Sequence, residues 1–447
     1  MTLTSAAPSG PTYRVGSLTV SPADPAYQAC LEAAHRRRND GPRPLCLCIR
    51  NGAEMYVSRV GGGYLLKRMP GRGAEHAWNC PSYEPPAELS GLGEVLGAAI
   101  QEDPVDGVTA LRLGFSLSKV SRRGPAANEG EPADSATSGG ARLSLRGLLH
   151  FLWEDAGFNS WSPAMAGKRG WPVVYRHLLA AVERKRCRGA PLAESLYLPE
   201  PWDERRKEEI AARRRATFLK LASVRKSPRK LMLLLAEVRL IEPGRYGHRL
   251  VVKHAPDVEF ALDDALEAAM RRRFETELST WEGDARGRGV RLVVLGTFAV
   301  GLSGRPALEE LVLMTVDRNW LPIEDAFDGA LIERLVAEER RFTRCLRYNL
   351  AASRPLACAL LADADPEPTA LYIVRPGVSE AHEAAFEAMM RASGLANWVW
   401  RPAEGPWPEL PRRRAAGRAT PTASPTLEGF DPFDTGPPAE GRSLIPR

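Results

Sequence analysis

Hydrophobic periodicity first divides the N-terminal part of the chain into short strand-like runs. Apolar and strand-forming residues occupy 54–60 and 64–69, and three glycines at 61–63 separate them. This pattern predicts a β-hairpin, because glycine accepts the backbone angles of a tight turn. Alternating residues at 108–117 predict another strand. We therefore expect an N-terminal β module.

In the middle of the chain, apolar residues recur every three or four positions. Residues 143–156 carry four leucines in such a stripe, which is typical of a helix that buries one face. A second helix is expected over 171–186, because Pro172 suits a first helical turn. A third, strongly basic helix is expected over 205–224. The sequence thus predicts a helical module at 142–225.

The remaining hydrophobic segments alternate between strand and helix patterns, which predicts a mixed α/β region over 226–402 and an α+β, multidomain protein overall. The elements expected there, in order, are strands at 231–241 and 248–254, a helix at 262–278, strands at 292–300 and 308–316, a helix at 329–348, strands at 356–361 and 370–374, a helix at 380–392 and a strand at 398–400.

Three segments lack hydrophobic periodicity and are rich in Pro, Gly, Ser or Thr. We expect 1–25 and the Pro-rich tail 403–447 to be disordered. Residues 121–141 are expected to be a flexible linker. These boundaries leave an N-terminal module at 26–120.

Composition is ordinary for a globular protein. The chain has 447 residues, of which 44% are hydrophobic and 26% charged; this length suggests about two to four domains. No apolar run reaches the roughly 18 residues of a membrane span, and the first twenty residues do not resemble a secretory signal. The sequence therefore predicts a cytoplasmic protein with no membrane association.

Cysteine and histidine spacing indicates a metal site. The seven cysteines are an odd and modest number, which favours reduced thiols or metal ligands over a disulfide framework. The sequence CLC contains Cys46 and Cys48, and HAWNC contains His76 and Cys80. A hairpin between the two pairs can bring them together, and structural zinc prefers four Cys and His ligands in a tetrahedron. We expect these residues to bind a structural zinc ion in a zinc-ribbon-like module.

Two alternatives remain open for this cluster. Cys30 or His35, which lie just upstream, could replace one ligand. In the other alternative, Cys46 and Cys48 alternate across a strand with one of them buried, and the second pair lies in a loop by chance.

The chain also resembles a known family through motifs that occur in order between Pro44 and Trp400. These motifs include CLC at Cys46, MYVSRV at Met55, YLLKRMPGRG at Tyr64, HAWNCPSYEPP at His76, SGLG at Ser90, LSLRGLLHFLWEDAG at Leu143, GKRGW at Gly167 and RRFTRCLRYNL at Arg340. The resemblance is to an uncharacterised bacterial domain-of-unknown-function family found mostly on plasmids and integrative conjugative elements. It implies a cytosolic mobile-element protein with N-terminal cysteines, and it implies no activity. Where relatives are expected to carry Gly-Glu-Val-Lys, this chain has Ala-Glu-Val-Arg at 236–239.

The two helices expected in the middle of the chain resemble a helix-turn-helix pair. Cations in and after the intervening loop are candidates for phosphate contacts, and an aromatic residue there could stack on a base. The candidate nucleic-acid contacts, including two on the N-terminal hairpin, are Lys67, Arg68, Lys168, Arg169, Trp171 and Arg176. Alternatively, the two helices belong to the core, with their tryptophans packed together and their cations solvated. The net charge of +6 permits binding to DNA or RNA without demonstrating it.

The C-terminal element order is similar to the core of restriction-type nucleases. Such enzymes bind a divalent metal with carboxylates on neighbouring strands, usually beside a lysine. Asp363 and Asp365 are candidates for the first carboxylate, and Glu237 could provide another from elsewhere in the chain. The strand expected at 370–374 has neither an acidic residue nor a lysine, so a degenerate domain fits better than an active nuclease.

Three functions follow as hypotheses. The first is a zinc-stabilised, noncatalytic protein of a mobile element that associates with nucleic acid, with other mobile-element proteins as candidate partners. The second is a divalent-metal-dependent nuclease with an unusual site. The third is a protein-interaction scaffold, because the apolar segment 430–434 could dock on a partner. No phosphate-binding loop, nucleophile elbow or zinc-protease helix motif is present in the sequence.

Overall fold

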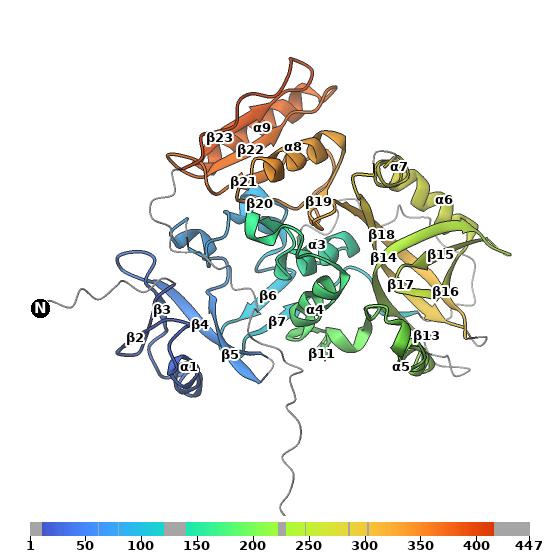
Figure 1. Ribbon diagram of the computed structural model, residues 1–447, viewed down its shortest axis with the longest axis horizontal. Helices are drawn as coiled ribbons and strands as arrows, with labels where there is room; N and C mark the ends of the chain where they lie inside the picture. The colour runs from blue at the N-terminus through green and yellow to red at the C-terminus, as the bar shows by residue number, and fades with distance from the viewer. Residues whose placement is uncertain are drawn as a thin grey trace, which may run out of the picture. The chain divides into compact units, whose positions relative to one another are not determined.

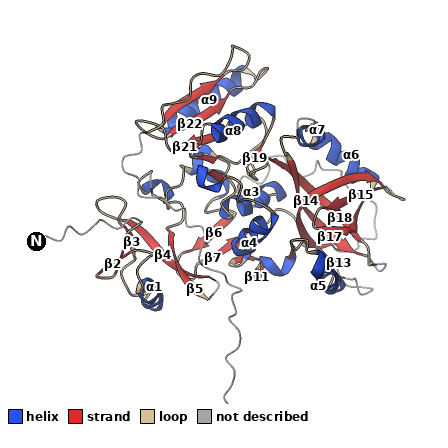
Figure 2. Cartoon of the chain, in the orientation of Figure 1, coloured by secondary structure: helices blue, strands red, loops and turns tan. Residues whose placement is uncertain are grey.

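The computed structural model describes residues 11–60, 62–78, 80–119, 140–221, 229–245, 247–284, 287–301 and 304–414 (Figures 1 and 2). Within these residues the chain forms two compact units. Unit 1 contains residues 11–84 and 104–107, and unit 2 contains residues 85–103 and 108–414. Most of the linker predicted at 121–141, and the tail from residue 415 onward with its apolar segment 430–434, lie outside the described residues.

Unit 1 is built on one antiparallel sheet with the strand order β2-β1-β3-β4-β5. Its strands are β1 (Tyr13–Val15), β2 (Leu18–Val20), β3 (Leu45–Cys46), β4 (Ala53–Val60) and β5 (Gly63–Arg68), and its helix is α1 (Tyr27–Arg36). Leu31 of α1 and Met55 of β4 are both fully buried in the same apolar cluster.

The predicted hairpin of unit 1 is confirmed, because β4 and β5 pair from Met55 with Arg68 to Val60 with Gly63. The predicted disorder up to residue 25 is wrong from residue 13 onward. There β1 and β2 pair with each other, and β1 also pairs with β3. Each of these two strands has only three residues, which is too short for an alternating pattern to stand out.

Unit 2 begins with short helices, a small sheet and the two helices predicted in the middle of the chain. The sheet has the order β11-β10-β7-β6. The elements are α2 (Leu92–Val95), β6 (Ile100–Asp103), β7 (Val108–Leu111), β8 (Ser118–Lys119), α3 (Leu145–Asp155), β9 (Ser160–Trp161), α4 (Trp171–Val182), β10 (Lys185–Cys187), β11 (Ala190–Pro191), β12 (Leu196–Tyr197) and α5 (Lys207–Leu219). Ser144 caps α3 by accepting a hydrogen bond from the N–H of Gly147.

A closed β-barrel forms the centre of unit 2. Its strands pair in the ring β14-β15-β16-β18-β17-β14. The barrel and its neighbours are β13 (Arg229–Lys230), β14 (Met232–Pro243), β15 (His248–Val252), β16 (Ala255–Leu262), α6 (Asp264–Arg273), α7 (Glu275–Glu282), β17 (Arg291–Val300), β18 (Pro306–Val316) and β19 (Pro322–Ile323).

The long strand β14 closes the barrel because it serves two partners. Its first half, up to Glu237, pairs with β17, and its second half, from Val238, pairs with β15. A bulge between Val238 and Leu240 separates the halves, and bulges increase the bend and twist of a strand. The barrel core is apolar, and the rings of Phe260 and Phe298 meet edge to face in it with their centroids 5.4 Å apart.

The C-terminal part of unit 2 is a second sheet, with the order β23-β22-β21-β20-β9. Its elements are α8 (Ala326–Ala337), β20 (Phe342–Arg344), β21 (Ala359–Leu361), β22 (Thr369–Ile373), α9 (Glu380–Ser393) and β23 (Ala396–Trp400). The predicted strands around residues 360, 371 and 399 and the helix α9 are confirmed. No helix of the described residues is long and apolar enough to cross a membrane.

Three helix predictions for unit 2 are wrong, and one strand was not predicted. The helix expected over 171–186 ends at Val182, because Lys185–Cys187 pairs in parallel with β7. The helix expected over 329–348 ends at Ala337, and strand β20 lies in the last part of that expected range. The helix expected over 262–278 is two helices, and β16 was not expected. Long-range strand pairing overrides the local pattern at β10, β16 and β20. The break between α6 and α7 is local, at Phe274, where φ is −115° and ψ is 35°.

The buried barrel core makes a testable contribution to stability. We expect Leu295→Ala, at a fully buried position of β17, to lower the free energy of unfolding by about 3 kcal/mol, because it removes apolar burial and leaves a cavity. The matched control Leu219→Ala, at a position of α5 that is 71% exposed, should change it by less than about 0.5 kcal/mol. Urea denaturation followed by tryptophan fluorescence measures both. Equal effects of the two substitutions would contradict the assigned core.

Candidate metal centre

The first pair of cysteines lies at the end of a central strand of unit 1. Cys46 is the last residue of β3, where it pairs with Tyr13 of β1 and Ala53 of β4. Cys48 follows in the turn that leads to β4. That turn ends at Gly52, whose φ of 75° favours glycine. The sheet therefore fixes the position of the first two thiols.

The second pair follows strand β5. The 3-10 helix η1 (Gly73–Glu75) reverses the chain and places His76 directly after it. The N–H of His76 donates to the carbonyl of Gly73, and the N–H of Cys80 donates to the carbonyl of Ala77 over 2.7 Å. A side chain at Gly73 would meet Cβ of Glu84 at 2.5 Å, so close packing holds this turn in place.

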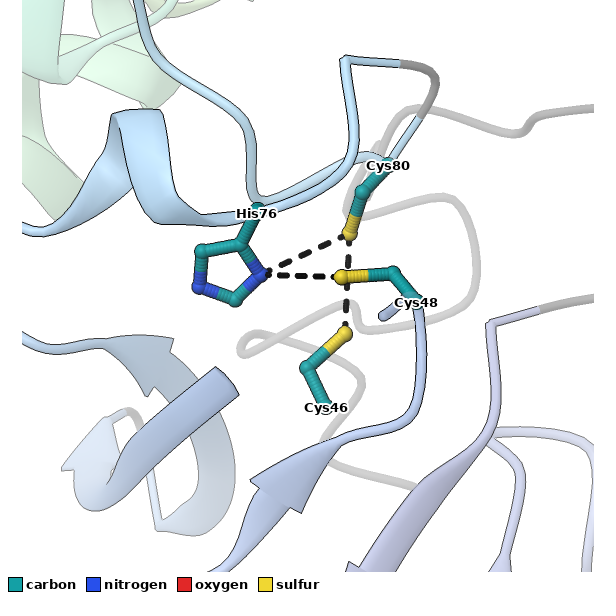
Figure 3. A group of neighbouring side chains, drawn as sticks. All are labelled: Cys46, Cys48, His76 and Cys80. Carbon is teal, nitrogen blue, oxygen red and sulfur yellow. Dashed lines mark hydrogen bonds between the residues drawn. The ribbon is translucent and has the colours of Figure 1, made fainter. Parts of the chain in front are cut away.

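Three sulfurs and one ring nitrogen converge on one point (Figure 3). The Sγ atoms of Cys46 and Cys80 are 3.6 Å apart. Nδ1 of His76 lies 3.5 Å from Sγ of Cys48 and 3.7 Å from Sγ of Cys80. All four atoms lie within 4.8 Å of one another. The cluster can therefore hold a metal ion.

Burial and hydrogen bonds shift the pKa values of the thiols in the cluster. Cys46 is buried, and its pKa is raised because its thiol donates a hydrogen bond to Cys80 and because it is desolvated. The pKa of Cys80 is lowered to about 4, mainly by that hydrogen bond from Cys46, and further by its contact with His76 and by the N–H of Ser82. The N–H of Ala77 also approaches Sγ of Cys48, at 3.4 Å. These donors stabilise negative charge on sulfur.

His76 is oriented by the same cluster. Its Nδ1 atom faces the sulfurs, whereas its Nε2 atom is buried and has no hydrogen-bond partner within the described part of the chain. A neutral imidazole that coordinates a metal through Nδ1 carries its proton on Nε2. Nδ1 is therefore the ligand atom that the geometry offers.

The four predicted ligands are thus brought together, and the two upstream candidates are not part of the group. Within the described residues, this is the one group of three or more Cys, His, Asp or Glu side chains with ligand atoms this close. Cys30 lies in α1, and the ring of His35 packs against Tyr64 at 5.3 Å. The backbone N–H groups of Ala77 and Ser82, which approach the sulfurs, could not be predicted from the sequence. Nearly every residue has a backbone N–H, so residue type does not mark the ones that contact a thiol.

Comparison with known proteins identifies the family to which the chain belongs. Residues 13–403 match the family described as "protein of unknown function (DUF1173)". The chain belongs to this family. The resemblance to an uncharacterised domain family is thereby confirmed. We found no match to a curated protein or to a solved structure.

In this DUF1173 protein, two of the residues predicted to contact nucleic acid instead donate hydrogen bonds to backbone carbonyls of the protein. The guanidinium of Arg169 donates to the carbonyls of Ser160, Gly157 and Asn319, and burial lowers its pKa to about 10. Trp171 is 4% exposed and donates from Nε1 to a backbone carbonyl. Trp171 is therefore buried, and the half-buried Arg169 has its guanidinium committed to backbone carbonyls, so neither side chain is free for a contact with a phosphate or a base.

The other four predicted contacts are reachable from solvent to different degrees. Lys67 and Arg68 lie on β5 of unit 1, and Arg68 pairs with Glu84. Lys168 and Arg176 are exposed, immediately before and within α4 of unit 2. Binding of nucleic acid by these residues stays a prediction.

The carboxylates considered for a nuclease are each engaged by cations. Asp363 accepts hydrogen bonds from Nε of Arg340 and from the backbone N–H of Arg341. Glu237, in β14, accepts from Lys253 and Arg291 at 2.9 Å each. Among the described residues these carboxylates and Asp365 do not form a group with close ligand atoms. The nuclease hypothesis gains no support from this arrangement.

The ligand set can be tested by single substitutions. We expect the purified protein to contain about one metal ion per chain and Cys80→Ser to contain almost none, because three remaining ligands bind a structural ion far less tightly. Elemental mass spectrometry measures this content. The matched control is Cys30→Ser, which removes a half-buried thiol outside the cluster and should leave the content unchanged. Loss of metal from Cys30→Ser, or its retention in Cys80→Ser, would contradict the assigned ligands.

Proposed function

We propose that this protein is a zinc-stabilised, noncatalytic protein that associates with nucleic acid. The ligand separations support zinc. Bonds of about 2.3 Å to sulfur and about 2.0 Å to nitrogen in a regular tetrahedron place two sulfurs about 3.8 Å apart and a sulfur and a nitrogen about 3.5 Å apart. The separations of 3.6, 3.5 and 3.7 Å in the cluster agree within about 0.2 Å. Three thiolates also favour zinc over magnesium or calcium.

The donor set supports a structural role. Four protein ligands fill a tetrahedral site, and a catalytic zinc keeps one position for water or substrate. The apolar cluster of unit 1 is small and includes Cys46 itself. In a module of this kind the free energy of metal binding contributes directly to the free energy of folding. Zinc would thus hold together the sheet and the segment that follows it.

Exposed cations support the association with nucleic acid. Lys168 and Arg176 are exposed and form no ion pair with a described residue. They lie on the loop and the first turns that lead into α4. Unpaired cations at a helix start are suited to phosphate contacts, which position a protein on a nucleic acid without reading its sequence. The family resemblance adds the setting of a plasmid or an integrative conjugative element to this proposal.

Salt dependence tests the association. We expect the protein to bind nucleic acid with an affinity that falls as salt rises, because each phosphate contact releases counterions. The double substitution Lys168→Ala with Arg176→Ala should lower the slope of log affinity against log salt by about 2. Fluorescence anisotropy at several salt concentrations measures this slope. The control Arg391→Ala removes a cation of α9 that is 71% exposed. Binding that does not change with salt would refute the proposal.

A further inference from the structure

The barrel of unit 2 has a recognisable topology. Numbered along the chain, its five strands close in the order 1-2-3-5-4-1, and the third and fifth strands, β16 and β18, are parallel. The other neighbouring pairs are antiparallel, and the helices α6 and α7 join the third strand to the fourth. This is the topology of the oligonucleotide- and oligosaccharide-binding barrel. Because one fold serves many functions, the ligand has to be inferred from the residues on the surface of the barrel.

Much of the barrel is covered by other elements of unit 2. The helix α3 packs on β17 and β18, where Nε1 of Trp153 donates to the carbonyl of Trp320 over 3.1 Å. Phe218 of α5 packs against the core rings of Phe260 and Phe298. The helices α6 and α7 pack on β18 as well. These contacts leave exposed side chains on β16 and on the second half of β14, whereas β15 contributes only the half-buried His248 and Arg249.

The open face carries cations at its margins. Arg239, at the bulge of β14, is exposed and has no ion-pair partner in the described part of the chain. Arg305, in the turn between β17 and β18, is 71% exposed and lies 3.9 Å from a carboxylate oxygen of Glu259. Between them, Arg249 of β15 pairs with both Glu242 and Glu259. The centre of the face is therefore neutralised, and the positive charge is held at two edges.

Small side chains and glycine turns make the face accessible. Ala261 of β16 is exposed and pairs with Arg249 of β15 and with Ala307 of β18, so this strand position carries only a methyl group. The carboxylate of Glu259 is the group that reaches both Arg249 and Arg305. The β17–β18 turn contains Gly304, which has a φ of 76° and open space around its Cβ position. In barrels of this topology, the face of the second and third strands and the turns that flank it form the binding surface.

We infer that the outer face of β14, β15 and β16, with Arg305 immediately before β18, binds single-stranded nucleic acid through its sugar-phosphate backbone. This inference rests on the proposed association with nucleic acid and names the strand type and the site. Arg239 and Arg305 contact phosphates at the two edges, and Arg249 contributes when a phosphate competes with its glutamates. Duplex reading inserts a helix or a two-stranded ribbon into a groove, whereas this face is an open sheet surface that suits one strand.

The test compares strands and variants of the full-length protein. Fluorescence anisotropy with a labelled oligothymidylate of about 20 nucleotides, longer than the site of one such barrel, is compared with a duplex of the same length. We expect tighter binding of the single strand. Arg239→Ala with Arg305→Ala should weaken single-strand binding by about tenfold at low salt and lower the salt slope by about 2.

A second variant is expected to bind more tightly, a result that partial unfolding would not produce. Glu259→Gln removes a carboxylate that faces both Arg249 and Arg305, so it should strengthen single-strand binding by about twofold to threefold. A partly unfolded variant would not do this. The matched controls are Arg391→Ala and Glu387→Gln, which change an exposed ion pair of α9 by the same charges and should have much smaller effects.

The results of these binding measurements distinguish a failure of the inferred site from a failure of the proposed function. If the wild-type protein binds neither strand form, both are wrong. If it binds but the barrel variants behave like the α9 controls, nucleic acid binds elsewhere and only the inference is overturned. Equal affinity for duplex and single strand would also overturn it.

Discussion

Unit 1 depends on the convergence of three thiols and one imidazole on a single point. Cys46 and Cys48 are carried by a central strand and the turn after it, whereas His76 and Cys80 follow the hairpin β4–β5. A metal ion bound at that point would cross-link the two ends of this hairpin segment. Because the apolar cluster of unit 1 is small, such a cross-link would replace burial that a larger core supplies.

Unit 2 is held together in a different way. Its largest apolar cluster runs from α3 and α4 into the barrel, and the barrel closes only because β14 pairs with β17 along one half and with β15 along the other. Hydrophobic burial and strand pairing account for this arrangement. In the proposed account a metal and its ligands stabilise unit 1 and an apolar core stabilises unit 2, and the proposed nucleic-acid contacts of unit 2 lie on the surface of that unit.

Local patterns predicted much of this arrangement, and long-range pairing explains the failures. The ligand pairs and the hairpin between them follow from short spacings and from the glycines at 61–63, which are properties of the sequence itself. The segment Lys185–Cys187 continued a helical pattern but pairs with β7, a partner more than seventy positions away. Arg169 and Trp171 had the right residue types for a nucleic-acid contact, but residue type does not reveal burial. The barrel order was equally hidden, because it depends on which strands meet.

X-ray absorption spectroscopy at the zinc edge of the purified protein tests the central claim most directly, because it reports the identity, number and distance of the atoms bound to the metal. The account predicts a four-coordinate zinc with three sulfur neighbours at about 2.3 Å and one nitrogen neighbour at about 2.0 Å. A first shell made only of oxygen and nitrogen, or a protein without zinc, would contradict the metal centre built from Cys46, Cys48, His76 and Cys80.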